Sequence, residues 1–379
     1  MSQKAKPSFS LKDQLFNPEK VAYLANQFSA VYPAFRSAQF QQDVVSHFPN
    51  LELKARITHI TECLHAHLPD DYLTALDIIL KALPPELDPT KTDDDFGDFI
   101  IAPLNHFVAM YGCTAEYLDA SLNAMKLITK RASAEDAIRF FINAFPEQTL
   151  EFLTQCATDE NYHVRRWASE GTRPKLPWSQ KLVIDHTQAL PILDLVFADK
   201  TRYVTRSVAN HLNDIAKIEP DLVISTLTRW KESGRQDPKE MKWMIQHATR
   251  TLIKHGNQDA LHLLGFGEEP DITISDFVTS TPDVKIGDAF EFSLTLTPNK
   301  DQNLMIDYTM LFATDGKRAG QKVFKLKQVE AKAGKPIKIK KKHPMRLMTT
   351  RTLYLGEHTI TLQVNGKSFN QLSFQLINP

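Results

Sequence analysis

The sequence has few cysteines, no long apolar run and no net charge, and each lack narrows what the protein can be. Its three cysteines, Cys63, Cys113 and Cys156, are odd in number and far apart, which favours free thiols in a reducing cytoplasm over a disulfide framework. No apolar run reaches the roughly 18 residues that span a bilayer, and the N-terminal MSQKAKPSFS lacks the hydrophobic core of a signal peptide. We therefore expect a cytoplasmic protein outside the membrane. Because Lys plus Arg and Asp plus Glu both total 45, the overall charge indicates no class of partner.

Glycine is scarce over most of the chain, and the spacing of apolar residues changes once, near residue 270. Before that point, segments such as 53–68 and 72–83 carry apolar residues at three- and four-residue intervals, as amphipathic helices do. After it, apolar residues alternate with polar ones between 290 and 296 and between 360 and 364, as in half-buried strands. A chain of 379 residues is long enough for two domains. The sequence therefore predicts an all-α domain over residues 1–268 and an all-β sandwich over residues 271–379.

A forty-residue internal repeat runs through the later part of the helical region. The segment HVRRWASE (163–170) aligns with YVTRSVAN (203–210) and with WMIQHATR (243–250), and the apolar positions coincide. An apolar segment precedes each copy. Two helices in forty residues is the period of HEAT-type repeats, which stack into a solenoid because no single pair can bury its own apolar face. We therefore expect a HEAT-like repeat solenoid.

The repeat also separates inward-facing positions from polar ones. In the second copy the inward stripe is Val204, Val208, Leu212 and Ile215, and the opposite stripe is Arg206, Asn210, Asp214 and Lys217. The register transfers the polar stripe to Arg166 and Glu170 in the first copy, and to Gln246, Arg250 and Lys254 in the third. These side chains are expected to line a groove that mixes basic and acidic groups. A merely solvated face is the alternative.

Four segments of the helical region resemble the AlkC branch of the HEAT-like-repeat alkylpurine DNA glycosylases. They are SAEDAIRFF (133–141), HVRRWASEGTRPKLPW (163–178), SVANHLNDIAK (207–217) and HATRTLIKHGNQDALHLLGF (247–266). Some members carry an immunoglobulin-like domain after the solenoid, which is similar to the β segment here. The resemblance implies a monofunctional DNA-3-methyladenine glycosylase that acts on double-stranded DNA as a monomer, without base flipping. Its substrates would be cationic alkylated bases, with 3-methyladenine first and 3-methylcytosine as a second candidate.

The resemblance also implies the site residues. The active-site acids of the family fall on Glu135, Glu170 and Asp214, and the site aromatic falls on Trp178. Carboxylates suit this reaction because a cationic base is a good leaving group, so the enzyme needs only negative charge beside an oxocarbenium-like sugar and a positioned water. The expected DNA-binding residues of the solenoid are Arg165, Arg166, Arg173, Lys175, Trp178, Arg206, Asn210, Arg250 and Lys254.

The zero net charge of the whole chain conceals a basic segment in the β region. Between Lys317 and Arg351 there are thirteen Lys or Arg residues and one acid, Glu330, so the rest of the chain has an excess of acids. Such concentration is the usual electrostatic footprint of a polyanion-binding surface. We expect Lys338, Lys340, Lys341 and Lys342 to contact DNA. The alternative is a lysine-rich edge strand that prevents sheet-to-sheet aggregation.

Other interpretations of the sequence remain open. His59, Cys63 and His67 recur every four residues on one helix face, but no fourth ligand is evident, so we expect no metal and no cofactor. The chain could instead be a non-catalytic HEAT-repeat scaffold that binds DNA or protein, or its β domain could recognise a partner unrelated to DNA. Three acids in a basic groove argue against the scaffold, and the lysine run at 338–342 argues against the last interpretation.

Overall fold

The computed structural model describes residues 10–91, 96–267, 269–315, 320–347 and 352–379. The described chain divides into two compact units. The first runs up to Ile215 and includes Ser233–Glu240, and the second comprises Ala216–Glu232 and Met241–Pro379. Lys317, Arg318 and Arg351, which belong to the basic segment of the sequence, lie outside the described residues.

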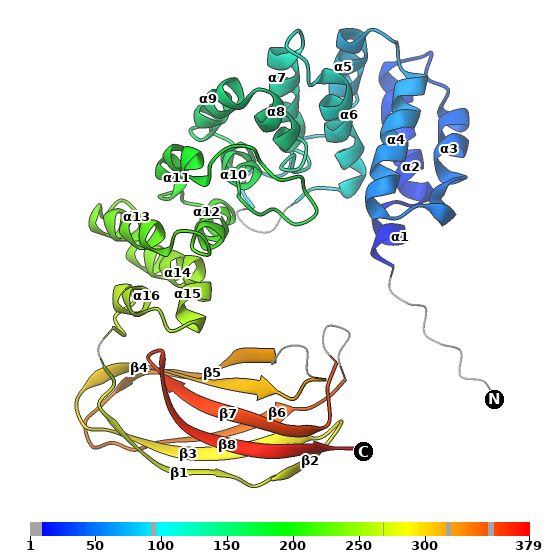
Figure 1. Cartoon of the computed structure of the whole chain (residues 1–379). Helices are drawn as coiled ribbons and strands as arrows, with labels where there is room; N and C mark the ends of the chain where they lie inside the picture. The colour runs from blue at the N-terminus through cyan, green and yellow to red at the C-terminus, as the bar shows by residue number, and fades with distance from the viewer. Residues whose placement is uncertain (1–9, 92–95, 268, 316–319, 348–351) are drawn as a thin grey trace, which may run out of the picture. The chain divides into compact units, whose positions relative to one another are not determined.

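The first unit is made of helices that pack against one another in chain order (Figure 1). Its helices are α1 (Leu11–Leu15), α2 (Pro18–Val31), α3 (Ser37–Val45), α4 (Leu53–His67), α5 (Tyr72–Lys81), α6 (Ala102–Gly112), α7 (Leu118–Thr129), α8 (Ile138–Ala144), α9 (Pro146–Cys156), α10 (Tyr162–Gly171), α11 (Leu190–Val196) and α12 (Arg202–Ile215). Short 3₁₀ turns are found at Phe48–Asn50, Phe99–Ile101 and His186–Ala189. No helix in the described part of the chain is both long and apolar enough to cross a membrane.

Local sequence signals explain where several of these helices begin. The side chains of Asn17, Asp71 and Asn161 accept hydrogen bonds from backbone N–H groups in the first turns of α2, α5 and α10, which would otherwise lack a partner. Proline occupies the first helical position of α2 and α9, where its missing N–H costs nothing.

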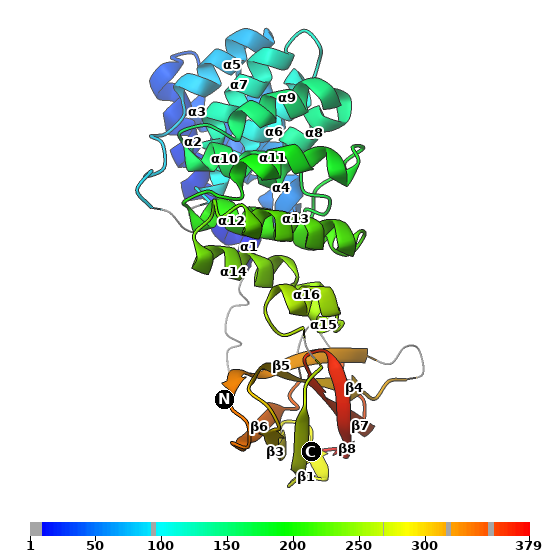
Figure 2. The same cartoon turned by 90° about the vertical axis from the view of Figure 1, so that its left-hand side faces the viewer.

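Helix α12 has the inward-facing stripe that the repeat predicts. Val204, Val208, Leu212 and Ile215 are fully buried, which confirms the predicted inward positions. The helix packs against α10 (Figure 2), so the second helices of two consecutive repeats lie side by side. Burial also extends to the side that the sequence indicated as polar, because Asp214 is only 6% exposed.

The second unit joins the last helices to a β-sandwich. Its helices are α13 (Pro220–Glu232), α14 (Pro238–Ala248), whose first turn belongs to the first unit, α15 (Arg250–Lys254) and α16 (Gln258–Leu263). The strands are β1 (Ile272–Thr279), β2 (Asp283–Lys285), β3 (Ala289–Pro298), β4 (Gln302–Phe312), β5 (Gly320–Ala331), β6 (Ile337–Pro344), β7 (Gly356–Val364) and β8 (Lys367–Ile377). A helical region followed by a β region is thus confirmed.

The two sheets of the sandwich enclose one apolar core. One sheet has the order β1-β3-β6 and the other the order β2-β8-β7-β4-β5, with antiparallel pairing everywhere except between β2 and β8. Along β3 burial alternates strictly, so the predicted alternation over 290–296 is confirmed. The inner faces contribute Phe290, Leu294, Ile306, Tyr308 and Leu362 to the core. Among the strands of the described residues, β6 is an edge strand that pairs with β3 alone.

Two glycines join the helical part of the second unit to the sandwich. Gly256 lies between α15 and α16 at φ +72°, and Gly366 lies in the two-residue β7–β8 turn at φ +77°. A Cβ atom on Gly256 would come within 2.6 Å of the Gly366 carbonyl oxygen. Gln258 Nε2 also donates a hydrogen bond to the carbonyl of Asn365, at 3.3 Å. The close backbone approach therefore depends on the absence of side chains at both positions.

We predict that Gly256→Ala destabilises the protein more than Gly334→Ala. Gly334 has a similar φ of +70° but nothing within 4 Å of its Cβ position, so it isolates the backbone strain from the clash. That strain alone should cost on the order of 1 kcal/mol. Thermal and denaturant unfolding of the intact protein measure the difference. Equal losses of stability would show that the contact between the two glycines is not tight.

Candidate active site

Three carboxylates that are distant in sequence lie close together in the first unit. Glu170 lies in the last turn of α10, Asp214 in the last turn of α12, and Glu135 in the turn that precedes α8. Since α10 and α12 pack against each other, Glu170 and Asp214 approach from neighbouring helices. The three acids singled out in the sequence are therefore neighbours, linked by arginines.

Arg173, just beyond the end of α10, links Glu170 to Asp214. Its Nη1 donates to Glu170 Oε1 at 2.6 Å, while its Nη2 and Nε donate to Asp214 Oδ2 at 2.9 and 3.1 Å. Glu170 Oε2 accepts a second hydrogen bond, from Ser207 Oγ at 2.6 Å. Both oxygens of Glu170 are thus occupied.

Arg166, one turn before Glu170 on α10, links it to Glu135. Its Nη2 lies 3.8 Å from Glu170 Oε1 and its Nη1 lies 3.6 Å from Glu135 Oε2. The guanidinium lies over two aromatic rings, with its Cζ 4.5 Å from the Tyr203 centroid and 5.2 Å from the Phe96 centroid. We refer to Glu135, Arg166, Glu170, Arg173 and Asp214 as the carboxylate–arginine chain.

Neighbouring charges outweigh burial in setting the pKa values of Glu170 and Arg173. Glu170 is 5% exposed, and although burial raises the pKa of its carboxyl group, the charges of Arg166 and Arg173 and the hydrogen bond from Ser207 hold that pKa below its ordinary value. Burial lowers the pKa of Arg173, but Glu170 and Asp214 raise it further than burial lowers it, so the guanidinium stays charged. Ionised carboxylates fixed in a site of low dielectric can stabilise a positive charge that develops beside them.

A buried arginine, Arg139, holds the loop after α10 through hydrogen bonds. Arg139 on α8 donates hydrogen bonds to the carbonyls of Gly171, Arg173 and Gln180, at 3.1, 2.8 and 2.8 Å. Trp178 in the same loop has a left-handed backbone, with φ 64°, and its side chain is 73% exposed. An aromatic residue with positive φ is strained, and such strain persists only where the surroundings enforce it. Lys54 on α4 contributes by donating to the Trp178 carbonyl.

The other residues that the sequence predicts to bind DNA lie in different parts of the structure. Arg165 bonds to Asp199 and to the carbonyls of residues 159 and 160, at the opposite end of α10 from Glu170. Lys175 is exposed in the loop after α10, and Arg206 and Asn210 are half-buried on α12. Arg250 and Lys254 belong to α15 and the second unit, as does β6 with its lysines.

Strand β6 divides its lysines between two faces. Lys338, Lys340 and Lys342 are exposed in one row, while Lys341 is half-buried in the alternate row with Ile339 and His343. Lys342 Nζ pairs with Glu291 at 2.6 Å.

Several side chains that organise the site were not found from the sequence. Ser207, Tyr203 and Arg139 carry no motif of their own, although the position of Arg139 inside the apolar helix IRFFINA is an unusual place for a cation. A buried charge in an apolar helix must find partners, and this signal could have identified it.

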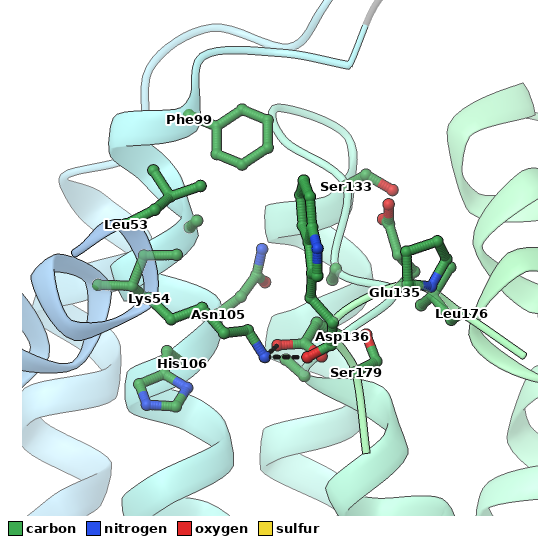
Figure 3. Close-up of a pocket in the computed structure, with 16 residues that line it drawn as sticks. Leu53, Lys54, Phe99, Asn105, His106, Ser133, Glu135, Asp136, Leu176 and Ser179 are labelled. Carbon is green, nitrogen blue, oxygen red and sulfur yellow. Dashed lines mark hydrogen bonds and ion pairs between the residues drawn. The ribbon is translucent and has the colours of Figure 1, made fainter. Parts of the chain in front are cut away.

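A cavity of about 270 Å³ opens beside Glu135 and Trp178. Figure 3 shows Leu53, Phe99, Asn105 and His106 along its wall, with Lys54 directed toward Asp136 at an ion-pair distance of 3.7 Å.

Comparison with known proteins covers both parts of the chain. The family described as "Uncharacterised protein YhaZ, C-terminal Ig-like domain" matches residues 273–378, which confirms an immunoglobulin-like sandwich. The Uncharacterized protein YhaZ of Bacillus subtilis (strain 168) is 30% identical over 367 residues, covering 96% of this chain and 98% of that protein. The solved structure of the Pseudomonas fluorescens alkylpurine DNA glycosylase AlkC, bound to DNA containing an abasic site analog, is similar with a TM-score of 0.86 and 34% identity. That match covers 97% of this chain and all of the solved chain.

We predict that Glu170→Gln makes the stability of the protein less dependent on pH in the acidic range. A carboxyl whose pKa is lowered on folding contributes its full stabilisation above its unfolded pKa, near 4.5, and loses it as the pH falls toward the folded value. The stability of the wild type should thus fall more steeply below about pH 5 than that of the variant. Melting temperatures between pH 3 and 8 measure this.

The control is Glu116→Gln, which removes the same charge from an exposed side chain. If both variants follow the acid limb of the wild type, Glu170 does not titrate with a lowered pKa.

Proposed function

Since this chain belongs to the AlkC family of HEAT-like-repeat alkylpurine DNA glycosylases, we propose that it hydrolyses the N-glycosidic bond of cationic alkylated bases in double-stranded DNA. The substrates are 3-methyladenine first and 3-methylcytosine second, and the enzyme acts as a monomer without base flipping. The observation that carries this proposal is the carboxylate–arginine chain, in which arginines hold three acids close together and one of them, Glu135, lines an open cavity.

The chemistry follows from the charge of the lesion. A base alkylated at N3 carries a positive charge, so the bond from C1′ to the base nitrogen breaks with its electron pair going to the base, and no acid is needed. The sugar becomes oxocarbenium-like, and water adds to C1′ while its proton passes to a carboxylate or to solvent. Negative charge near C1′ stabilises this transition state.

The hydrogen bonds of the three acids suggest a division of roles. Both oxygens of Glu170 are occupied by Arg173 and Ser207, and Asp214 is bound by Arg173. Glu135 Oε2 is buried and makes no hydrogen bond within the described part of the chain. We propose that Glu135 holds the attacking water, and that Glu170 and Asp214 supply fixed negative charge.

The roles of the basic residues divide in the same way. Arg166 and Arg173 are engaged with carboxylates, so we assign them to positioning the acids. Lys175 and Trp178 are exposed next to the site and contact the lesion strand. The remaining proposed DNA contacts are Arg165, Arg206, Asn210, Arg250, Lys254, Lys338, Lys340, Lys341 and Lys342.

We predict that Glu135→Gln and Glu170→Gln each reduce excision of 3-methyladenine by about 10²–10³-fold, the usual effect of removing one group that stabilises the transition state. Both variants should keep their affinity for abasic-site duplex, because the amide preserves shape. Single-turnover release of free base from alkylated duplex DNA is the measurement.

Glu116→Gln again serves as the control, and its rate should match that of the wild type. A Glu135→Gln enzyme with unchanged rate and melting temperature would remove Glu135 from the mechanism. DNA binding by the wild type without any base release would favour a non-catalytic scaffold.

We predict that selectivity follows the charge of the leaving group. Duplexes with 3-methyladenine should be processed, and otherwise identical duplexes with uracil or hypoxanthine should not, because these neutral bases need protonation and the pKa of Glu170 is held below its ordinary value. The three substrates are compared in one single-turnover assay. Efficient release of uracil contradicts this mechanism.

A further inference from the structure

The cavity beside Glu135 is small, largely apolar and bounded by four separate segments of the first unit. Its walls come from the start of α4, the start of α6, the turn before α8 and the loop after α10. The apolar lining includes Leu53, Ile57, Phe99, Leu176 and Trp178. Its volume of about 270 Å³ lies below the range of roughly 300–1,000 Å³ that is typical of sites for drug-sized ligands. The cavity therefore suits one small ring system.

One residue of the cavity wall carries an unsatisfied buried acceptor. Asn105 on α6 is only 3% exposed and lines the cavity, with its Nδ2 donating to the carbonyl of Ala132 at 3.3 Å. Its Oδ1 is buried and has no hydrogen-bond partner among the described residues. An unsatisfied buried acceptor costs free energy in the empty site, and a ligand with an N–H donor would satisfy it.

The charged groups of the wall argue against a phosphorylated ligand. Among the lining residues the one Lys or Arg is Lys54, and its Nζ is already engaged with Asp136 and with the Trp178 carbonyl. Burial lowers the pKa of the His106 imidazole below its ordinary value, which disfavours a positive charge there. Glu135 adds a carboxylate to the rim. A nucleotide phosphate would meet repulsion here, whereas an uncharged base would not.

The aromatic wall is held in place by the fold. Trp178 keeps a strained backbone because Lys54 binds its carbonyl and Arg139 binds the carbonyls on either side of the loop. The side chain nevertheless remains 73% exposed. Exposed aromatic faces are platforms on which nucleobases stack. Strain of this kind concentrates at ligand clamps.

We propose that this cavity binds a free purine base, stacked on Trp178 and donating an amino hydrogen to Asn105 Oδ1. The inference rests on the proposed function, because the base released at the neighbouring carboxylates is the nearest source of such a ligand. A base that leaves as the neutral species loses its attraction to the acids and enters the apolar cavity. The cavity is thus a product site, through which accumulated base inhibits the enzyme.

The test uses the intact protein, free 3-methyladenine and free adenine. Equilibrium dialysis with radiolabelled base should give a stoichiometry of one for the wild type. Ala102→Phe adds a ring to the cavity wall and should weaken binding at least tenfold, whereas Ala30→Phe adds the same ring to an exposed position on α2 and should have no effect. Phe99→Ala removes an exposed side chain from the wall, so it should fold and bind base more weakly.

A second readout separates this proposal from the proposed function. Added 3-methyladenine should slow excision by the wild type, and Ala102→Phe should relieve this inhibition while keeping the single-turnover rate.

Each outcome bears on one of the two proposals. If the wild type excises normally but binds no free base up to the solubility limit of that base, the product site alone is overturned. Equal affinity of the wild type and Ala102→Phe for free base would overturn it as well. Base binding without excision overturns the glycosylase and keeps the site. If Ala102→Phe loses affinity for lesion-containing duplex but not for free base, the cavity holds a base still attached to DNA, and the product-site proposal fails.

Discussion

The alternation of carboxylates and guanidiniums between α8, α10 and α12 is the constraint on which the site depends. Removing an ion from water costs several kcal/mol unless an opposite charge and hydrogen bonds replace the solvent. Glu170, at 5% exposure, meets this requirement through Arg166, Arg173 and Ser207. Its ion pairs with Arg166 and Arg173 are local in sequence, but the hydrogen bond from Ser207 and the ion pair between Arg173 and Asp214 form only when α10 and α12 pack at the observed register. The packing of the repeats therefore also determines where the acids lie.

The loop after α10 connects the carboxylate–arginine chain with the wall of the neighbouring cavity. Arg173 at its start belongs to the carboxylate–arginine chain, and Trp178 further along belongs to the cavity wall. Arg139 binds the carbonyls of Arg173 and Gln180 and so fixes both ends of the segment that carries Trp178. Arg139 thereby positions two surfaces of different chemistry. One is charged and suited to a developing cation, and the other is apolar and suited to a neutral ring.

Periodicity in the sequence was sufficient to predict the architecture and the inward stripe of α12, because burial of one helix face is a local property. The forty-residue register also placed Glu170 and Asp214 on the same polar stripe, with Glu170 aligned to Asn210, and the packing of α10 on α12 brings the two acids together. It could not show what Arg166 and Arg173 contact, since register fixes the face of a helix and not the partner from another element. The role of Arg139 was hidden for the same reason, because it binds carbonyls 32 to 41 residues away. The cavity had no sequence signal, as its walls come from four separate segments.

The two electrostatic systems of the protein respond differently to salt. The ion pairs that Glu170 makes with Arg166 and Arg173 are largely buried, so mobile ions screen them little. Lys338 and Lys340 lie on an exposed edge strand, where each phosphate contact would release condensed counterions and weaken steeply as salt rises. Both explanations of the basic strand are physically compatible, because charges that attract a polyanion also prevent another edge strand from pairing with β6. Under the proposed function, separate charges would attract DNA and stabilise the sugar cation, so ionic strength would act on binding and leave the chemical step largely unaffected.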